Sequence, residues 1–487
     1  MEAAWLAPSG SMTDASHIRP LRQNSKSVLS LIYLFLSPIN FFPNVKQMSQ
    51  LTILHPHAGA IDIGASELYC NTYEHEEVEV FIYTQEGLEA MVKMFVSSGV
   101  DTVALEATGV YWLPVYEALE SAGVEVYMVN GAHVKQLPGR KSDISDALWL
   151  RSLHQYGLLK AGFVPEASIR CLRSYIRVRD THIRQGSEEV LRMHKALDLM
   201  GLKIHQVLSQ IQGKSGLAIL DAIVDGERDI SILVGLTDGR VQKNKAEQLA
   251  QALKGNYAKE HLFLLQQALK SWRFHQEQMG QCDREIEIQL QEMTQEKEVP
   301  QIEDQPKGMR HNAPKIADLH RLLLTLSQGK NPTQIEGIND YSFLKLVAHT
   351  GLDMEAWANE KRFVSYAGLA PSHDRSGKRK RRRYRKGNKE VKNIFMLLAR
   401  SVAKMDTELG AFYRQLKARK GPAVAMKALA RKIAIRYYRI MKFGTDYIVK
   451  GTEWFEHNFK QQKTNRLIKQ LKKLNPDNQL IAQLTVA

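Results

Sequence analysis

The order of short apolar runs and helix-like segments after Ala58 is the feature that most constrains the fold of this chain. Candidate strands cover residues 60–63, 68–72, 78–84, 102–106 and 124–129, and candidate helices cover residues 85–98, about 113–121, and a segment beginning near Asp143. Strands that alternate with helices predict an α/β domain. Three strands in a meander followed by alternating helices and strands is the order of the RNase-H-like fold, although other α/β domains come close.

After residue 165 the strand pattern disappears, and mostly apolar residues recur at steps of three and four. One seam comprises Leu172, Ile176, Arg179, Ile183, Gly186, Val190, Met193, Leu197 and Met200. A second comprises Leu262, Leu265, Leu269, Trp272, Gln276, Met279, Asp283, Ile286, Leu290 and Met293. This spacing predicts coiled-coil packing. An ordinary helical-bundle face is an equal alternative, because polar Gln276 and Asp283 lie in the second seam.

The sequence predicts α/β plus all-α architecture in five segments. They are an N-terminal extension at 1–50, the α/β domain at 51–165, a helical region and proline-marked linker at 166–318, a mainly helical domain at 319–450, and a basic tail at 451–487. The apolar run at 28–42 is too short and too interrupted for a membrane span, and no signal-peptide cleavage site follows it. We expect natural translation to start at Met48, which makes residues 1–47 an appended stretch.

Positive charge is concentrated in one region of the chain. Lys and Arg outnumber Asp and Glu by 67 to 52 overall, but by 24 to 5 in residues 371–450 and by only 43 to 47 elsewhere. A phosphate backbone is the natural partner of such a region. Cys70, Cys171 and Cys282 are far apart and form no CxxC pair, which fits a reducing cytoplasm and predicts neither a disulfide framework nor a cysteine zinc site.

Four carboxylates occupy the positions that an RNase-H-like nuclease requires. Asp62 lies in the first predicted strand and Glu106 ends the fourth, while Asp143 and Asp146 lie three residues apart on one helix. Such carboxylates provide the oxygen ligands that Mg²⁺ prefers, and two Mg²⁺ ions assist phosphoryl transfer. The alternative is that Asp143 caps its helix and Asp146 is an exposed surface residue.

The segment from Ala60 to Ser66 also resembles the Asp-x-Gly-x-Ser turn of actin-like and sugar-kinase ATPases, which share the strand order. Those enzymes carry a second glycine-rich phosphate loop, and the sequence contains none. Gly213-Lys214-Ser215 is no P-loop, because position 208 is Leu208 and no strand precedes it.

Ser376-Gly377 precedes a run from Lys378 to Lys386 in which only Tyr384 is not Lys or Arg. A hydroxyl beside a glycine and many cations is suited to attack on a phosphodiester. A plain turn serine beside an exposed charge cluster is the alternative from the residues alone.

Taken together, these motifs resemble the IS110 family of insertion-sequence transposases, and within it the IS1111 group. The resemblance rests on AIDIGAS with Asp62, ALEATGVYW with Glu106, VNGAHVKQLPGRKSDISDALWL ending in Asp143 and Asp146, and YAGLAPSHDRSGK before the basic run. It extends in the same order from about Ala58 to Tyr447.

The resemblance implies a RuvC-like domain with a DEDD metal site, a coiled-coil middle and a transposase domain whose serine attacks DNA. The DEDD set is then Asp62, Glu106, Asp143 and Asp146, and the nucleophile is Ser376, with Ser372 as its rival. The expected nucleic-acid-binding residues are Arg140, Lys141, Lys378, Arg379, Lys380, Arg381, Arg382, Arg383, Arg385 and Lys386.

The implied partners are donor and target DNA, a structured guide RNA from the element, and further copies of the chain in a homodimer or homotetramer. We therefore expect an RNA-guided recombinase that acts in the cytoplasm. The alternatives are a RuvC-like metal-dependent junction endonuclease, in which Ser376 has no chemical role, and a non-catalytic RNA-binding scaffold.

Overall fold

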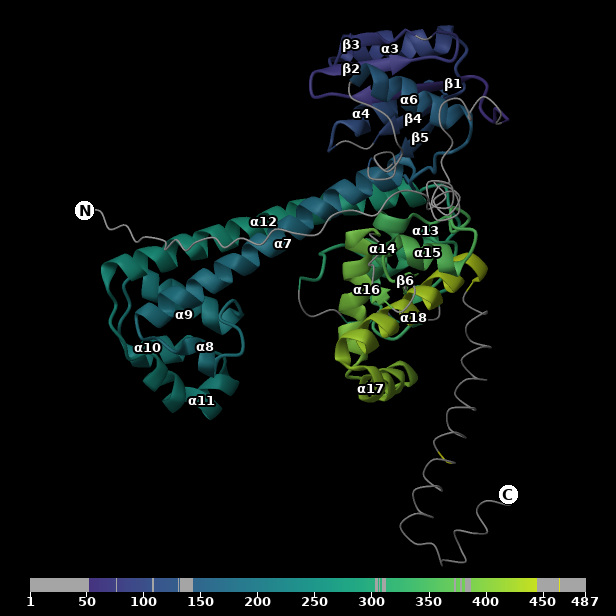
Figure 1. Cartoon of the computed structure of the whole chain (residues 1–487). Helices are drawn as coiled ribbons and strands as arrows, with labels where there is room; N and C mark the ends of the chain where they lie inside the picture. The colour runs from purple at the N-terminus through teal and green to yellow at the C-terminus, as the bar shows by residue number, and fades with distance from the viewer. Residues whose placement is uncertain are drawn as a thin grey trace, which may run out of the picture. The chain divides into compact units, whose positions relative to one another are not determined.

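The computed structural model describes residues 52–75, 77–106, 109–129, 131, 143–302, 305, 307–308, 312–371, 374–376, 379–381, 387–444 and 464 (Figure 1). The chain divides into two compact units, of which the first ends at Val164 and the second begins at Pro165. The predicted extension at 1–50 and nearly all of the predicted tail at 451–487 lie outside the described residues.

The first unit contains a five-stranded mixed sheet of strand order β3-β2-β1-β4-β5. Its strands are β1 (Ala58–Ile63), β2 (Glu67–Asn71), β3 (Glu79–Ile82), β4 (Thr102–Glu106) and β5 (Glu125–Val129). β1, β2 and β3 form an antiparallel meander, whereas β4 is parallel to both β1 and β5. The RNase-H-like order predicted from the sequence is confirmed.

Helices cover both faces of this sheet because side chains alternate between the faces along each strand. Helices α3 (Gln85–Ser97) and α4 (Trp112–Ser121) pack on the face that carries Ile61 and Leu105. Helix α6 (Asp143–Gln155) packs on the opposite face, where Leu150 and Leu153 contact Ala60 and Ala104. The small alanines let α6 lie close to the strands.

The second unit begins with two long helices, α7 (Ala167–Leu199) and α12 (Lys259–Thr294), which pack side by side (Figure 1). The two apolar seams predicted from the sequence meet in this contact within a single chain. Between them the chain forms α8 (Ile204–Val207), α9 (Lys214–Val224), α10 (Ile230–Gly235) and α11 (Gly239–Ala252). These helices share an apolar core with one end of the α7–α12 pair.

The rest of the second unit is mainly helical. It comprises α13 (Leu319–Leu326), the 3₁₀ helix η1 (Pro332–Gln334), α14 (Asp340–Thr350), α15 (Glu360–Tyr366), the hairpin β6 (Asp374–Ser376) and β7 (Arg379–Arg381), α16 (Lys389–Val402), α17 (Glu408–Lys420) and α18 (Pro422–Phe443). Phe343, Phe363, Phe395 and Tyr437 are fully buried in its core. The helix predicted at 423–442 is present as α18.

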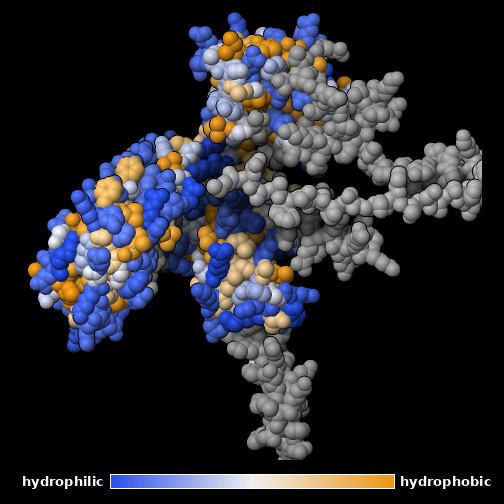
Figure 2. Space-filling model, turned by 60° about the vertical axis from the view of Figure 1, so that its left-hand side comes forward, coloured by the Kyte–Doolittle hydropathy of each residue, from blue (hydrophilic) through white to orange (hydrophobic). Residues whose placement is uncertain are grey.

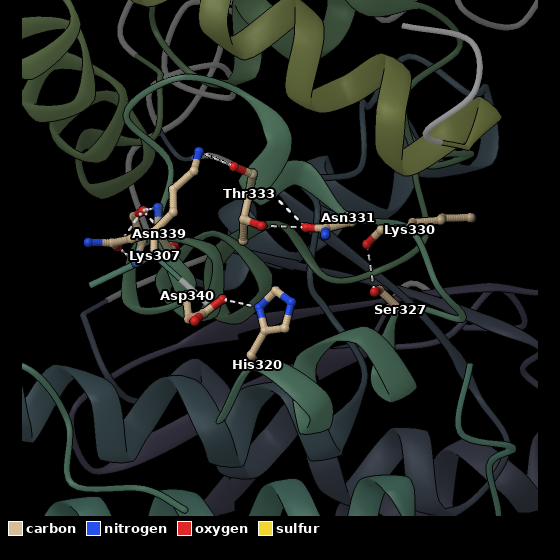
Figure 3. A network of polar contacts seen from close by, with 9 residues as sticks. Lys307, His320, Ser327, Lys330, Asn331, Thr333, Asn339 and Asp340 are labelled. Carbon is tan, nitrogen blue, oxygen red and sulfur yellow. Dashed lines mark hydrogen bonds and ion pairs between the residues drawn. The ribbon is translucent and has the colours of Figure 1, made fainter. Parts of the chain in front are cut away.

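A polar network orders the turn between α13 and α14 (Figure 3). His320 Nδ1 lies 2.7 Å from Asp340 Oδ1, which joins the two helices. Asn331 accepts hydrogen bonds from the backbone and hydroxyl of Thr333, and Lys307 donates to the Thr333 carbonyl. Because these contacts lie within the turn and between its two flanking helices, the network is a structural element of the turn.

Most of the coloured residues on the face drawn in Figure 2 are hydrophilic, and hydrophobic ones lie among them. Among the described helices, none is both long and apolar enough to cross a membrane.

Candidate functional site

Strand register aligns the first two predicted carboxylates. In the parallel pair of β1 and β4, Ala60 is opposite Ala104 and Ile61 is opposite Leu105. One further step of this register sets Asp62 beside Glu106, and both are half-buried. Each lies two residues beyond an alanine that faces α6, so both carboxylates emerge on the face of the sheet that α6 covers.

Helix α6 brings Asp146 to the same end of these strands. Asp146 precedes Leu150 by four residues and therefore lies on the sheet-facing side of the helix. At the other end of α6, His154 Nε2 lies 3.0 Å from Thr102 Oγ1, at the start of β4.

The lengths of α6 and β4 place Asp146 along the sheet. The eight residues from Asp146 to His154 span about 12 Å of helix, and the four from Thr102 to Glu106 span about 13 Å of strand. Since α6 runs against the direction of β4, Asp146 comes level with Glu106.

Arg151 holds α6 in this position on the sheet. Its Nη1 donates to the carbonyl oxygens of Thr72 and His75, both at 2.8 Å, just beyond β2. Arg151 was not predicted from the sequence, because a lone arginine within an amphipathic helix carries no signal for a contact about 80 positions away.

The backbone after β5 lies directly against Glu106. A Cβ atom built on Gly131 would be 2.0 Å from Glu106 Oε1 and 2.7 Å from Glu106 Cδ. Only a residue without a side chain fits here with the carboxylate in place, so the glycine of the sequence VNGAHV borders the carboxylate end of the sheet.

The carboxylates suit a hard divalent cation, because carboxylate oxygens are its preferred ligands. Within the part of the chain that the structure describes, however, no group of three His, Cys, Asp or Glu side chains lies close enough to hold a metal ion. Asp143 begins α6, one turn before Asp146, but its side chain lies outside the described residues. Asp62, Glu106 and Asp146 are therefore brought to one end of the sheet, and the fourth member of the predicted set is placed only by its backbone.

Ser376 ends β6 and pairs with Arg379 of β7, so it lies where this short antiparallel hairpin closes. No strands were predicted here from the sequence. The side chains of the hairpin strands lie outside the described residues, as do Ser372, Arg140, Lys141, Lys378, Arg382, Arg383, Arg385 and Lys386 in full.

The two segments that flank this hairpin meet at its base. Asn388 N donates to the Tyr366 carbonyl at 2.7 Å, and Asn388 Nδ2 donates to the Tyr366 hydroxyl at 2.9 Å. That hydroxyl donates to the His349 carbonyl at 3.0 Å. Neither Tyr366 nor Asn388 was given a role from the sequence, although Tyr366 begins the YAGLAPSHDRSGK motif and Asn388 lies two residues after the basic run.

The basic residues of α18 are largely matched by acidic partners. Lys432 and Arg436 both contact Glu408, and Arg439 contacts Glu360. Burial opposes ionisation of Glu408, but the Lys432 hydrogen bond and the Arg436 charge hold the pKa of Glu408 below its usual value. These cations stabilise the domain, so the excess charge available to a phosphate backbone lies mainly elsewhere in residues 371–450.

Two family profiles match the chain. A DEDD transposase profile of the IS110 type matches residues 60–201, and the profile described as transposase IS116/IS110/IS902 family matches residues 331–414. No curated protein matches the chain.

An RNase-H-like sheet edged by carboxylates, together with the DEDD match over it, defines a DEDD transposase. The second match, over the domain that carries the hairpin, identifies the family, and the chain belongs to the IS110-family transposases. Membership implies a DNA substrate and a DNA-processing activity, and the DEDD domain implies dependence on a divalent metal.

Proposed function

We propose that this transposase is an RNA-guided DNA recombinase that moves its own element by using both the carboxylates and Ser376. The observation that carries the proposal is the alignment of Asp62 with Glu106 by the β1–β4 register, with Asp146 of α6 level with them. Carboxylates that converge from two strand ends and a helix start can hold the metal ions that assist phosphoryl transfer on DNA.

Asp62, Glu106, Asp143 and Asp146 would hold the metal, which we propose to be Mg²⁺, as two ions. Bound there, Mg²⁺ neutralises charge that develops on the phosphate oxygens. The protein contributes the orientation of the carboxylates, since β1, β4 and α6 are packed in a common core.

Ser376 would supply the nucleophile. Its Oγ bonds to the phosphorus of a DNA phosphodiester, the bond from phosphorus to one sugar oxygen breaks, and the proton lost by the serine passes to that leaving oxygen. The phosphoserine ester conserves the bond energy for rejoining, whereas hydrolysis by water loses it. Cationic residues of the run Lys378–Lys386 and of Arg140 and Lys141 would bind nucleic-acid phosphates.

The partners in this proposal are donor DNA, target DNA and a structured RNA transcribed from the element. A homodimer or homotetramer would bring serine and carboxylates of different copies to one DNA junction. Sequencing the RNA that co-purifies with the protein tests the guide: one discrete transcript from the flank of the element supports it, and bulk cellular RNA alone contradicts it.

The decisive experiment on the chemistry uses pairs of variants. Glu106→Gln and Ser376→Ala should each abolish strand exchange and leave binding of RNA and DNA near normal. Asp101→Asn, at the opposite end of β4, and Ser372→Ala are the matched controls and should retain exchange. Mass spectrometry of protein trapped on a nicked target should find a nucleotide on the peptide that contains Ser376. Exchange by Ser376→Ala, or an adduct on another residue, would favour the junction endonuclease instead.

A further inference from the structure

The β6–β7 hairpin leaves and rejoins the helical domain at a single point. A Cβ atom on Gly387 would lie 2.4 Å from Gly368 N and 2.6 Å from Gly368 Cα, so the two backbones touch. Gly368 has a φ of +64°, a conformation that side chains other than glycine rarely adopt. The chain between these glycines contains Ser376, and its two ends are therefore held together at the base.

One hydroxyl group links this base to the surrounding helices. The Tyr366 hydroxyl accepts from Asn388 Nδ2 and donates to the carbonyl of His349, in the last turn of α14. Asn388 Oδ1 in turn accepts from the backbone amides of Glu390 and Val391 and so caps α16. Tyr366 thereby connects the end of α14 to the start of α16, where the hairpin returns.

Helix α7 also contacts the end of α14 to which the Tyr366 hydroxyl is bonded. Arg173 Nε donates to the Ala348 carbonyl at 2.7 Å, and Arg173 Nη2 donates to the His349 carbonyl at 3.3 Å. The His349 carbonyl thus accepts from both Arg173 and Tyr366. Burial, together with the charges of nearby cations including Arg173, lowers the pKa of His349 to about 3 and keeps its imidazole neutral. Both partners of the Tyr366 hydroxyl are therefore held in place: Arg173 binds the His349 carbonyl, and the cap of α16 holds Asn388.

We propose that Tyr366 is a positioning residue for the serine: through Asn388 it fixes the return of the hairpin and hence the place of Ser376. This inference rests on the proposed role of Ser376. Ser376 lies in the chain between Gly368 and Gly387, so a shift of the base moves the two points from which this chain starts and to which it returns. Misplacement of a reacting group by about 1 Å is enough to cost roughly 100-fold in rate.

The test compares the full-length Tyr366→Phe variant with Tyr437→Phe. Tyr437 is a matched control, because it is a buried tyrosine of the same core whose hydroxyl lies 3.2 Å from Thr350 Oγ1 and makes no contact with Asn388. Two rates are measured on protein with its co-purifying RNA and added Mg²⁺. They are the rate of formation of the serine–DNA adduct on a saturating nicked duplex of the element's end sequence, and the rate of trypsin cleavage within residues 378–386. DNA affinity and melting temperature are recorded for each variant.

We expect Tyr366→Phe to lower the adduct rate by about 10- to 100-fold, to speed trypsin cleavage several-fold, and to leave DNA affinity within about twofold. Tyr437→Phe should change neither rate. Asn388→Ser keeps a helix-capping hydroxyl but loses the donor to Tyr366, so it should reproduce the defect, and the double variant should be no worse than either single one.

Each other outcome contradicts part of the reasoning. Unchanged trypsin cleavage in Tyr366→Phe would show that the hydroxyl does not hold the hairpin, whether or not the serine is the nucleophile. Faster cleavage with an unchanged adduct rate, or equal losses in Tyr437→Phe, would overturn the positioning role. If wild-type protein forms no adduct at Ser376, the proposed chemistry fails, and the trypsin result still decides whether Tyr366 holds the hairpin.

Discussion

Substitution of Asp283 by Asn should destabilise the α7–α12 pair far more than its conservative size suggests. Asp283 and Arg179 form an ion pair in which the side chains are 4% and 0% exposed, and Arg179 Nε lies 2.5 Å from Asp283 Oδ1. Arg179 also donates to the Tyr341 hydroxyl and the Asn312 carbonyl, while Lys315 N donates to Asp283 Oδ2. One buried pair therefore joins α7, α12, α14 and the segment before α13.

The magnitude follows from burial. Removal of one partner of a buried pair leaves an uncompensated charge and costs about 3–5 kcal/mol. Asn retains one acceptor, so we expect a loss of about 3 kcal/mol. The pair between Arg273 and Asp221 makes a control, because its side chains are 51% and 36% exposed, and Asp221→Asn should cost at most about 1 kcal/mol.

Hydrogen exchange of α7 and α12 peptides in increasing urea measures both losses locally. With a slope of about 3 kcal/mol per molar urea at most, Asp283→Asn should lower the midpoint by about 1 M or more. The double variant Arg179→Met with Asp283→Leu removes both charges and should recover most of the stability. Equal midpoints for Asp283→Asn and Asp221→Asn would refute the argument that burial sets the cost.

Two further predictions concern the sheet domain. Gly131→Ala should raise the Mg²⁺ concentration needed for strand exchange by about tenfold or more, because the new Cβ displaces the Glu106 carboxylate. Gly235→Ala is the control and should not raise it, because a Cβ at Gly235 meets nothing within 4 Å. A titration of the exchange rate with Mg²⁺ compares the two variants. Burial and the charge of His55 lower the pKa of His154 from 6.5 to about 4. As the pH falls, the imidazole of His154 is therefore protonated in the unfolded chain before it is protonated in the folded one. The free energy of unfolding should then be about 3 kcal/mol lower near pH 4 than above pH 6.5. Urea unfolding of wild type and His154→Gln across that range checks this, and an equal pH dependence in the two would contradict it.

The sheet was predictable because its information is local. The apolar runs of β1, β4 and β5 and the amphipathic helices between them each have their own period, and the right order of strands and helices then favours one topology. The prediction that Asp62 and Glu106 belong together used this order. The evidence for it came from register, a property of strand pairing that no single segment contains.

The second unit shows the limit of local patterns. The sequence predicted the apolar seams of α7 and α12, but it did not predict what they pack against. An apolar seam can pack against a helix of another chain as well as against one of its own chain. The segment around Ser376 was interpreted as a basic nucleic-acid surface, and no strands were predicted in it, because a run of arginines and lysines carries little strand propensity.

The sequence by itself determined which segments become strands and helices, which of their faces are apolar, and where carboxylates and cations are concentrated, because these depend on neighbours a few residues apart. Only the tertiary structure decided what the polar residues within those faces do. In the sequence, Arg179 and Asp283 are charged residues within mostly apolar seams. In the structure they form an ion pair with each other, although they are 104 positions apart. Tyr366 gains its role from Asn388, 22 positions away across the hairpin. Such pairs form only when packing of the helices brings distant residues together and buries them, so no local stretch of sequence predicts them.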